Sequence, residues 1–319
     1  DETGAAVLYR SRDLLTWDLA GEITFPDAGG ALDDFGFMWE CPGLVTLTDE
    51  ATGRERDVLI WCPQGARPEG AEGYENVFPC IYAVGRLVGT ELRECDGTVR
   101  EVDRGFEFYA PQAFARRPGE PGPVLLTGWA GNAGQDDQPS IATGGWVHAL
   151  TAPRALSLRD GRLIQRPAPA LPDSAPALGA TGSRPAGAAR LGELDGHRSW
   201  HLVMDIEELG EGAWVGLRIG DDSCFVSLCL RRTDAGPQLV VDRSASRYAR
   251  HGARRTVGVP AAAAGRLEVL HDRSITEIFV GDGDLAFTLR SFVAPDSTGA
   301  VLVADGPVRL GPVAAVHFD

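Results

Sequence analysis

Short apolar runs recur along the first half of the chain, with Gly, Pro and Asp between them. Ala6 to Tyr9, Leu44 to Leu47, Val58 to Trp61 and Val124 to Thr127 are such runs. Short runs rich in β-branched and aromatic residues predict β-strands, and almost no stretch has the 3.6-residue apolar period of a helix. The pattern therefore predicts an all-β chain.

The pattern changes after Leu163. Residues 166–179 are rich in Pro and Ala and predict a linker. Beyond it the runs are longer and alternate more cleanly, as in Trp200 to Ile206, and two further candidates, 266–271 and 275–280, are joined by Asp272-Arg273-Ser274. A short polar connection between alternating runs predicts a hairpin. We therefore predict part of a β-propeller over residues 1–165 and a β-sandwich over residues 180–319.

Composition narrows the classes of partner and cofactor. The 319 residues carry a formal charge of -15, which argues against nucleic acid, because phosphate binding needs clustered cations. No apolar stretch approaches the roughly 20 residues of a membrane span. The six cysteines form no C-x-x-C pair and favour reduced, buried thiols. His197 and His201 are four apart, but in a predicted strand that spacing does not align metal ligands. We expect neither a metal nor a membrane partner.

Glu40 is the residue that first suggests chemistry. It stands in Phe37-Met38-Trp39-Glu40-Cys41-Pro42-Gly43, between an aromatic ring and a thiol, just before an apolar run. Partial desolvation in such surroundings suits a carboxyl group to donate a proton near neutral pH. The spacing alone equally allows a structural glutamate at the start of a strand, partnered by a backbone amide.

Other segments, in a fixed order, resemble the motifs of glycoside hydrolase family 32, which contains invertases, levanases and inulinases. Trp39-Glu40-Cys41-Pro42 resembles the family's Glu-Cys-Pro motif, and residues 9–17 resemble its Tyr-x-Ser-x-Asp-Leu-x-x-Trp stretch. The remaining matches are Cys62-Pro63-Gln64-Gly65, Tyr82-Ala83-Val84-Gly85, Asp103 to Gln112, Thr127-Gly128-Trp129, Gly145-Trp146, Pro153-Arg154-Ala155-Leu156, Asp242-Arg243-Ser244 and Asp272 to Gly283.

The resemblance implies a five-bladed β-propeller with a funnel-shaped active site, followed by a β-sandwich. It implies a retaining hydrolase of β-fructofuranosides such as sucrose, fructo-oligosaccharides, levan or inulin, without a cofactor. Glu40 would be the acid/base, while Trp39 and Cys41 would shape the pocket. Asp103, Glu107, Tyr109 and Trp129 would contact the sugar or, for Tyr109, position the catalytic carboxyl. From the residues alone Tyr109 and Trp129 are equally acceptable as core residues, and Asp103 as a turn residue.

Two departures from the family pattern matter. The family's nucleophile lies in Trp-x-Asn-Asp-Pro-Asn-Gly and its transition-state-stabilising Asp in Arg-Asp-Pro, and this sequence contains neither motif. We expect the chain to be the C-terminal part of a family member, completed by an N-terminal chain or prone to self-association. Glu107 also replaces the family's usual Asp. The alternative interpretation is a carbohydrate-binding or interaction module without turnover.

Overall fold

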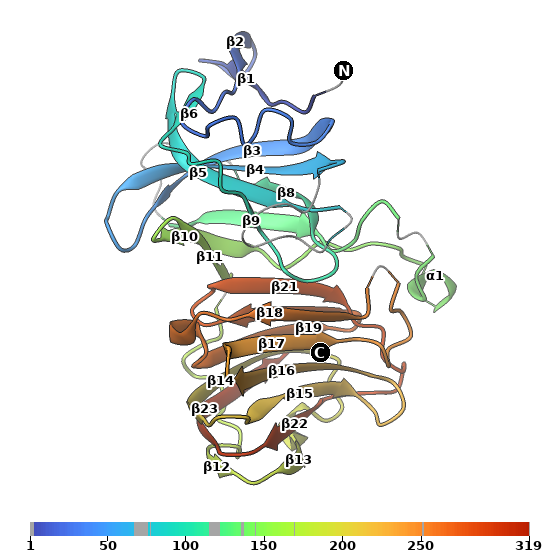
Figure 1. Cartoon of the computed structure of the whole chain (residues 1–319). Helices are drawn as coiled ribbons and strands as arrows, with labels where there is room; N and C mark the ends of the chain where they lie inside the picture. Colours follow the sequence, from blue (N-terminus) through green and yellow to red (C-terminus); the bar gives the residue numbers. More distant parts are fainter. Residues whose placement is uncertain are drawn as a thin grey trace. The chain divides into compact units, whose positions relative to one another are not determined.

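The computed structural model describes residues 3–66, 76, 78–114, 122–134, 137–143, 145–168, 170–250 and 252–318. Strands dominate these residues (Figure 1), as the sequence predicts. The helical segments within the described ranges are short: α1 (Ser140–Thr143), η1 (Gly192–Leu194) and η2 (Ala261–Ala263). None of the helices among these residues is long and apolar enough to cross a membrane.

The chain divides into two compact units. The first comprises residues 1–103, 108–129 and 152–164, and the second comprises 104–107, 130–151 and 165–319. The sequence-based ranges differ from these units, because 104–107 and 130–151 fall inside the predicted first domain. The predicted linker differs as well: β11 (Arg162–Pro167) extends into it, and Leu178 is buried in the core of the second unit.

The strands of the first unit form antiparallel meanders in which sequence neighbours pair. The order β3-β4-β5-β6 makes one sheet, with β7 also paired to β5, and β8-β9-β10-β11 makes another. A separate hairpin consists of β1 (Val7–Arg10) and β2 (Asp18–Glu22). This is the strand order of propeller blades. The bounds are β3 (Met38–Thr48), β4 (Glu55–Gln64), β5 (Ile81–Val88), β6 (Glu91–Arg93), β7 (Arg100–Glu101), β8 (Tyr109–Ala113), β9 (Val124–Trp129) and β10 (Arg154–Arg159).

The central strand β4 is buried on both faces. Val58, Ile60 and Cys62 pack into one apolar cluster of the first unit, whereas Leu59 and Trp61 pack into another. Side chains alternate across a strand, so a continuous apolar run supplies two cores at once. This alternation decides which residues near Glu40 face the candidate site and which face away.

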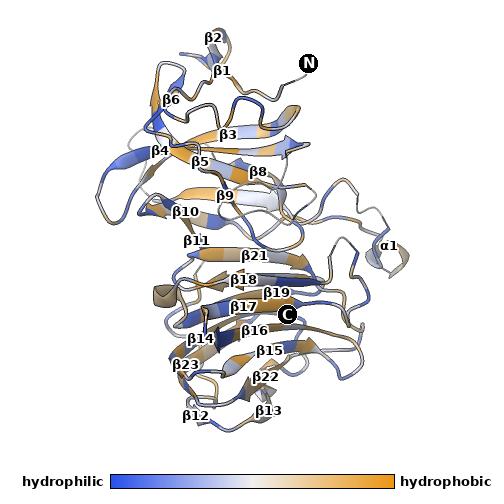
Figure 2. Ribbon diagram, in the orientation of Figure 1, coloured by the Kyte–Doolittle hydropathy of each residue, from blue (hydrophilic) through white to orange (hydrophobic). Residues whose placement is uncertain are grey.

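The second unit is a β-sandwich of two antiparallel sheets. Their orders are β12-β23-β14-β19-β20-β21 and β13-β22-β15-β16-β17-β18. The bounds are β12 (Gly182–Arg184), β13 (Gly187–Arg190), β14 (Ser199–Leu209), β15 (Trp214–Gly220), β16 (Phe225–Thr233), β17 (Gly236–Asp242), β18 (Arg254–Gly258), β19 (Arg266–Asp272), β20 (Ile275–Val280), β21 (Leu285–Arg290), β22 (Ala300–Asp305) and β23 (Val308–His317). Hydrophobic residues concentrate along these strands (Figure 2) and form one core.

Several details of the sandwich follow the sequence analysis. The hairpin predicted around Asp272-Arg273-Ser274 is confirmed, with Arg273 in the left-handed conformation at φ 55°. The two histidines do not converge: His201 Nε2 lies 2.7 Å from Glu268 Oε1, while the His197 ring stacks on His317. Among the residues that the structure describes, no group of three or more His, Cys, Asp or Glu side chains could hold a metal ion.

Candidate active site

Glu40 lies near the start of β3, where the strand is irregular. Its carboxyl group is partly exposed, and its backbone pairs with Cys62 on β4. The register of the pairing shifts between Glu40 and Gly43, and Cys41 takes a left-handed conformation with φ 49°. Such a β-bulge bends the strand and redirects a side chain, a device common next to active sites. The bulge therefore sets the direction of the Glu40 side chain.

Tyr109 is the direct partner of Glu40. Its hydroxyl donates a hydrogen bond to Glu40 Oε2 at 2.5 Å. Burial, and then the bond to Glu40, raises the pKa of Tyr109 well above its ordinary value, while a hydrogen bond with the Gln64 side chain acts in the opposite direction. The phenol consequently keeps its proton at neutral pH and serves as a permanent donor to the carboxyl group.

A second bulge follows Tyr109. The register of β8 against β9 shifts between Tyr109 and Gln112, and Ala110 is left-handed with φ 46°. Each member of the hydrogen-bonded pair is thus followed directly by a strained non-glycine residue. Residues held in sparsely populated backbone regions cluster at functional sites, which supports this pair as the chemical centre.

Aromatic side chains surround the Tyr109 ring. Trp129 meets it edge to face, with centroids 6.3 Å apart, and Phe78 does so at 5.9 Å. Trp129 is partly buried and packs against the apolar cluster that contains Tyr109. The structure therefore brings together four of the predicted site residues: Glu40, Cys41, Tyr109 and Trp129.

Three thiols, those of Cys41, Cys62 and Cys80, lie near this pair. The Cys80 thiol is hydrogen-bonded to Cys62, and the Cys62 sulfur accepts the Ala110 amide at 3.3 Å. Burial raises the pKa of Cys41 and Cys80, so these two thiols stay neutral near pH 7. Neutral, desolvated thiols are poor nucleophiles, so Cys41 and Cys80 are not candidate nucleophiles.

Trp39 was predicted to shape the pocket around Glu40, but its side chain lies on the other face of β3. It neighbours Glu40 in β3, so its side chain points to the opposite face of the strand. There it stacks on Trp61 with centroids 4.8 Å apart, and its indole Nε1 donates to the Phe35 carbonyl at 2.6 Å. Only 7% of its surface is exposed. Trp39 is a core residue of the first unit rather than a wall of the pocket.

Asp103 and Arg154 form a buried ion pair in the first unit. The carboxylate lies 3.0 Å from Arg154 Nη2, and both side chains are almost completely buried. The guanidinium also lies over the Phe108 ring, 4.6 Å from its centroid. A carboxylate enclosed in this way favours a structural role for Asp103, and its contact to the sugar stays a prediction.

Glu107 belongs to the second unit. Its two carboxylate oxygens lie 2.6 and 2.8 Å from Arg243 Nη1, and the Arg290 amide donates to Oε2 at 2.8 Å. Both Glu107 and Arg243 have fully buried side chains. The oxygens of Glu107 are thus engaged inside the sandwich unit, and we propose a structural role for this residue; its contact to the sugar stays a prediction.

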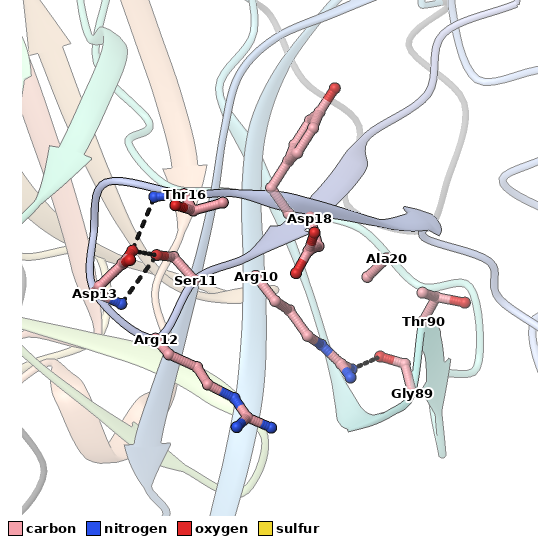
Figure 3. Close-up of a pocket in the computed structure, with 10 residues that line it drawn as sticks. Arg10, Ser11, Arg12, Asp13, Thr16, Asp18, Ala20, Gly89 and Thr90 are labelled. Carbon is pink, nitrogen blue, oxygen red and sulfur yellow. Dashed lines mark hydrogen bonds between the residues drawn. The ribbon is translucent and has the colours of Figure 1, made fainter.

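The Tyr-x-Ser-x-Asp-Leu stretch builds a turn. Asp13 Oδ1 accepts the Leu15 amide at 2.8 Å. It also accepts the Thr16 amide at 2.8 Å and the Ser11 hydroxyl at 3.1 Å (Figure 3). Figure 3 also shows Arg10 reaching the carbonyl of Gly89, a 2.8 Å hydrogen bond. These residues line an open hollow of about 1010 Å³ that does not include Glu40. The motif thus shapes the β1–β2 hairpin rather than the candidate site.

Two residues that support the site have no role predicted from the sequence. Cys62 and Gln64 stand in a segment that resembles a family motif, yet the motif does not show that they contact the Ala110 amide and Tyr109. Register between β3 and β4 was the missing signal, because it places Cys62 opposite Glu40. Ala110 could not have been found, since a left-handed alanine has no sequence signature.

Comparisons with known proteins agree with these observations. The family model described as glycosyl hydrolases family 32 N-terminal domain matches residues 1–167, and the one described as the family 32 C-terminal matches residues 200–317. A sucrose-6-phosphate hydrolase of Staphylococcus xylosus is 32% identical over 303 residues, which cover 93% of this chain and 56% of that protein. The chain spans about half the length of the curated relatives it matches.

Solved structures show the same fold. The sucrose-6-phosphate hydrolase of Lactobacillus gasseri has a TM-score of 0.75 at 24% identity, covering 100% of this chain and 61% of that chain. The fructan 1-exohydrolase IIa of Cichorium intybus has a TM-score of 0.76 at 17% identity, covering 100% and 67%. The predicted fold class, part of a β-propeller followed in sequence by a β-sandwich, is confirmed. With both halves matched by its models, the chain belongs to glycosyl hydrolase family 32.

Proposed function

We propose that this chain forms part of a retaining glycosidase that cleaves β-fructofuranosidic bonds, with Glu40 as the acid/base. The observation that carries the proposal is the 2.5 Å hydrogen bond from the Tyr109 hydroxyl to Glu40 Oε2, at a partly exposed carboxyl group. Tyr109 occupies one oxygen and leaves Oε1 to face the glycosidic oxygen. Since the phenol keeps its proton, it also stabilises the carboxylate that remains after proton transfer.

The proposed reaction has two steps. In the first, Glu40 protonates the glycosidic oxygen while a second carboxylate attacks the anomeric carbon, forming a fructosyl ester and releasing the leaving sugar. In the second, the Glu40 carboxylate takes a proton from water, which attacks the same carbon and frees fructose. Retention requires the two carboxyl groups to lie about 5 Å apart. The nucleophilic Asp is expected from outside these 319 residues, because the family's Asn-Asp-Pro-Asn-Gly motif does not occur among them.

The fructosyl unit is the part of the substrate that the relatives share. Their names specify sucrose-6-phosphate hydrolases, and a β-fructofuranosidase of Bombyx mori has been solved in complex with sucrose. We therefore propose sucrose, free or phosphorylated, as the first substrate to test. Parallel assays with sucrose and sucrose 6-phosphate separate the two.

The β1–β2 hairpin is the proposed contact to the rest of the catalytic domain. Val7, Tyr9 and Leu19 expose 56%, 51% and 61% of their surface, although each is apolar or aromatic. Tyr9 and Leu19 are directly paired, so both side chains lie on the same face. A two-stranded hairpin with an exposed apolar face is marginally stable alone and favours further strands beside it. We propose further strands of the same family domain as its partner.

Replacing the carboxyl group of Glu40 by an amide tests the function. In a complete enzyme that contains this chain, Glu40→Gln should lower sucrose turnover by roughly 10²–10⁴-fold, the usual contribution of general acid/base catalysis. Glu55→Gln, an exposed carboxyl of the same unit outside the β1–β2 hairpin, is the matched control and should leave turnover unchanged. Sucrose binding without hydrolysis by the unaltered complete protein would favour the carbohydrate-binding alternative instead.

A further inference from the structure

Cys62 connects the two bulges that carry the Glu40–Tyr109 pair. Its backbone on β4 pairs with Glu40 on β3, directly before the first bulge. Its sulfur accepts the backbone amide of Ala110, the left-handed residue of the second bulge, at 3.3 Å. The side chain is fully buried, and the Cys80 thiol is hydrogen-bonded to the same sulfur. A single residue therefore touches both irregular segments.

Tyr109 directly precedes the residue whose amide makes this contact. Ala110 follows Tyr109 directly, so any change at the Ala110 peptide moves the Tyr109 backbone. The shift of register between Tyr109 and Gln112 removes regular pairing with β9 at this point. The sulfur supplies the hydrogen-bond acceptor that the regular ladder does not, which keeps the bulge in its left-handed conformation.

We propose that Cys62 is a positioning residue of the acid/base: by accepting the Ala110 amide, it fixes the bulge that aims the Tyr109 hydroxyl at Glu40 Oε2. The effect on catalysis rests on the proposed function, whereas the effect on the position of the Tyr109 hydroxyl does not. The reading of Cys62 as simple core filling predicts no specific effect on Tyr109.

A matched control is present in the same unit. Cys95 is also a buried thiol, with 1% of its surface exposed, and it interacts with the Gly97 amide. It belongs to the other apolar cluster, away from Tyr109. Cys95→Ala removes the same number of atoms from a buried site, so it reproduces the loss of packing without touching the Ala110 contact.

The geometric test uses NMR on the complete enzyme that contains this chain. In Cys62→Ala, the Ala110 amide should exchange with solvent at least about tenfold faster, because it loses its acceptor. The ¹³Cζ resonance of Tyr109 should then titrate closer to the ordinary tyrosine pKa of about 10. Glu40, Gln64 and Cys62 itself affect the Tyr109 pKa, and Cys62→Ala also removes the charge of the Cys62 thiolate. Cys62→Ser removes that charge too, so a difference between the Ala and Ser variants reports the acceptor alone. Cys62→Ser, which keeps an acceptor, should restore much of both signals, and Cys95→Ala should leave them unchanged.

A second substitution guards against loss of folding. If Cys62→Ala does not fold, Cys62→Val fills the site without an acceptor and should show the same two changes. Unchanged Ala110 exchange and Tyr109 titration in a folded Cys62→Ala or Cys62→Val variant would overturn the proposal. Equal changes in Cys95→Ala would overturn it as well, because they would report general loosening of the core.

The catalytic test uses the complete enzyme. Cys62→Ala should lower kcat by up to about 10²-fold with little change in KM, as expected for a misplaced catalytic group. Cys62→Ser should recover most of that loss. A fall in kcat shared by Cys95→Ala would contradict the proposal. Absence of fructoside hydrolysis in the unaltered complete enzyme would refute the proposed function, whereas the NMR result would still decide the geometric role of Cys62.

Discussion

The buried pair of Glu107 and Arg243 should stabilise the second unit rather than bind sugar. We consider Glu107→Ala, which removes a carboxylate bonded to Arg243 Nη1 at 2.6 and 2.8 Å and to the Arg290 amide. Arg243 keeps three backbone acceptors, the carbonyls of Gly252 at 2.8 Å, Arg250 at 2.6 Å and Arg290 at 3.4 Å. Its charge nevertheless remains buried without a counter-ion.

The size of the effect follows from this burial. Both side chains are 0% exposed, so solvent does not screen the pair. Removing one partner of a buried ion pair costs about 3–5 kcal/mol, because an uncompensated charge remains in the interior. With an m-value of about 2 kcal/mol per molar urea, the midpoint of unfolding should fall by roughly 2 M. Asp222→Asn is the control, since the Asp222 side chain is 90% exposed and surface pairs contribute about 0–1 kcal/mol.

Urea denaturation of the complete enzyme measures this difference. Because two units can unfold separately, hydrogen exchange of amides in β20 and β21 should identify the second unit as the one destabilised. In the complete enzyme, sucrose KM of any folded Glu107 variant should be nearly unchanged. Wild-type stability of Glu107→Ala together with a large rise in KM would refute the structural assignment and restore Glu107 as a sugar contact.

The remaining predictions concern the site, the sandwich and the exposed hairpin. Tyr109→Phe in the complete enzyme should lower kcat by about 10- to 100-fold, since hydrogen bonds to charged groups contribute about 1.5–3 kcal/mol, and a KM effect alone would contradict this. Hydrogen bonds from Ser223 lower the pKa of Asp221 to about 2, so its stabilising effect is present above its unfolded pKa of about 3.9 and is lost as the pH falls through about 2. Unfolding of Asp221→Asn should therefore differ from wild type at neutral pH and converge with it near pH 2. The isolated chain should self-associate, and Leu19→Ser should reduce this in size-exclusion chromatography with light scattering; a monomeric wild type would argue against the proposed hairpin contact.

The fold class was accessible from the sequence because strand patterns are local. Runs such as Val58 to Trp61 and the Asp272-Arg273-Ser274 connection correspond to β4 and the β19–β20 hairpin. The unit boundaries were not accessible, because they depend on pairing between distant segments. Residues 104–107 join the second unit through bonds such as that from the Phe106 amide to the Thr288 carbonyl at 2.8 Å. The local sequence does not predict such a contact.

For the candidate site, too, some features could be predicted from the sequence and others could not. Motif resemblance was sufficient to select Glu40 and Tyr109 as candidates, and the structure brings their side chains into contact. It failed to separate residues that touch a ligand from residues that support the fold, since a motif preserves both. Trp39 illustrates this, because simple alternation along β3 already directs it away from Glu40. Asp103 and Glu107 required knowledge of their arginine partners, which lie 51 and 136 positions away in sequence.

The role of Glu40 as acid/base is tested most directly by azide rescue of Glu40→Gln in the complete enzyme. An activated fructoside with a good leaving group needs little protonation, so its first step should be nearly normal in the variant. Release of the fructosyl ester should then be slow, because water lacks a base, and azide, which needs none, should accelerate it. The account predicts azide-dependent turnover with a fructosyl azide of retained configuration. Near-normal sucrose hydrolysis by Glu40→Gln, or a slow variant that azide does not accelerate, would contradict it.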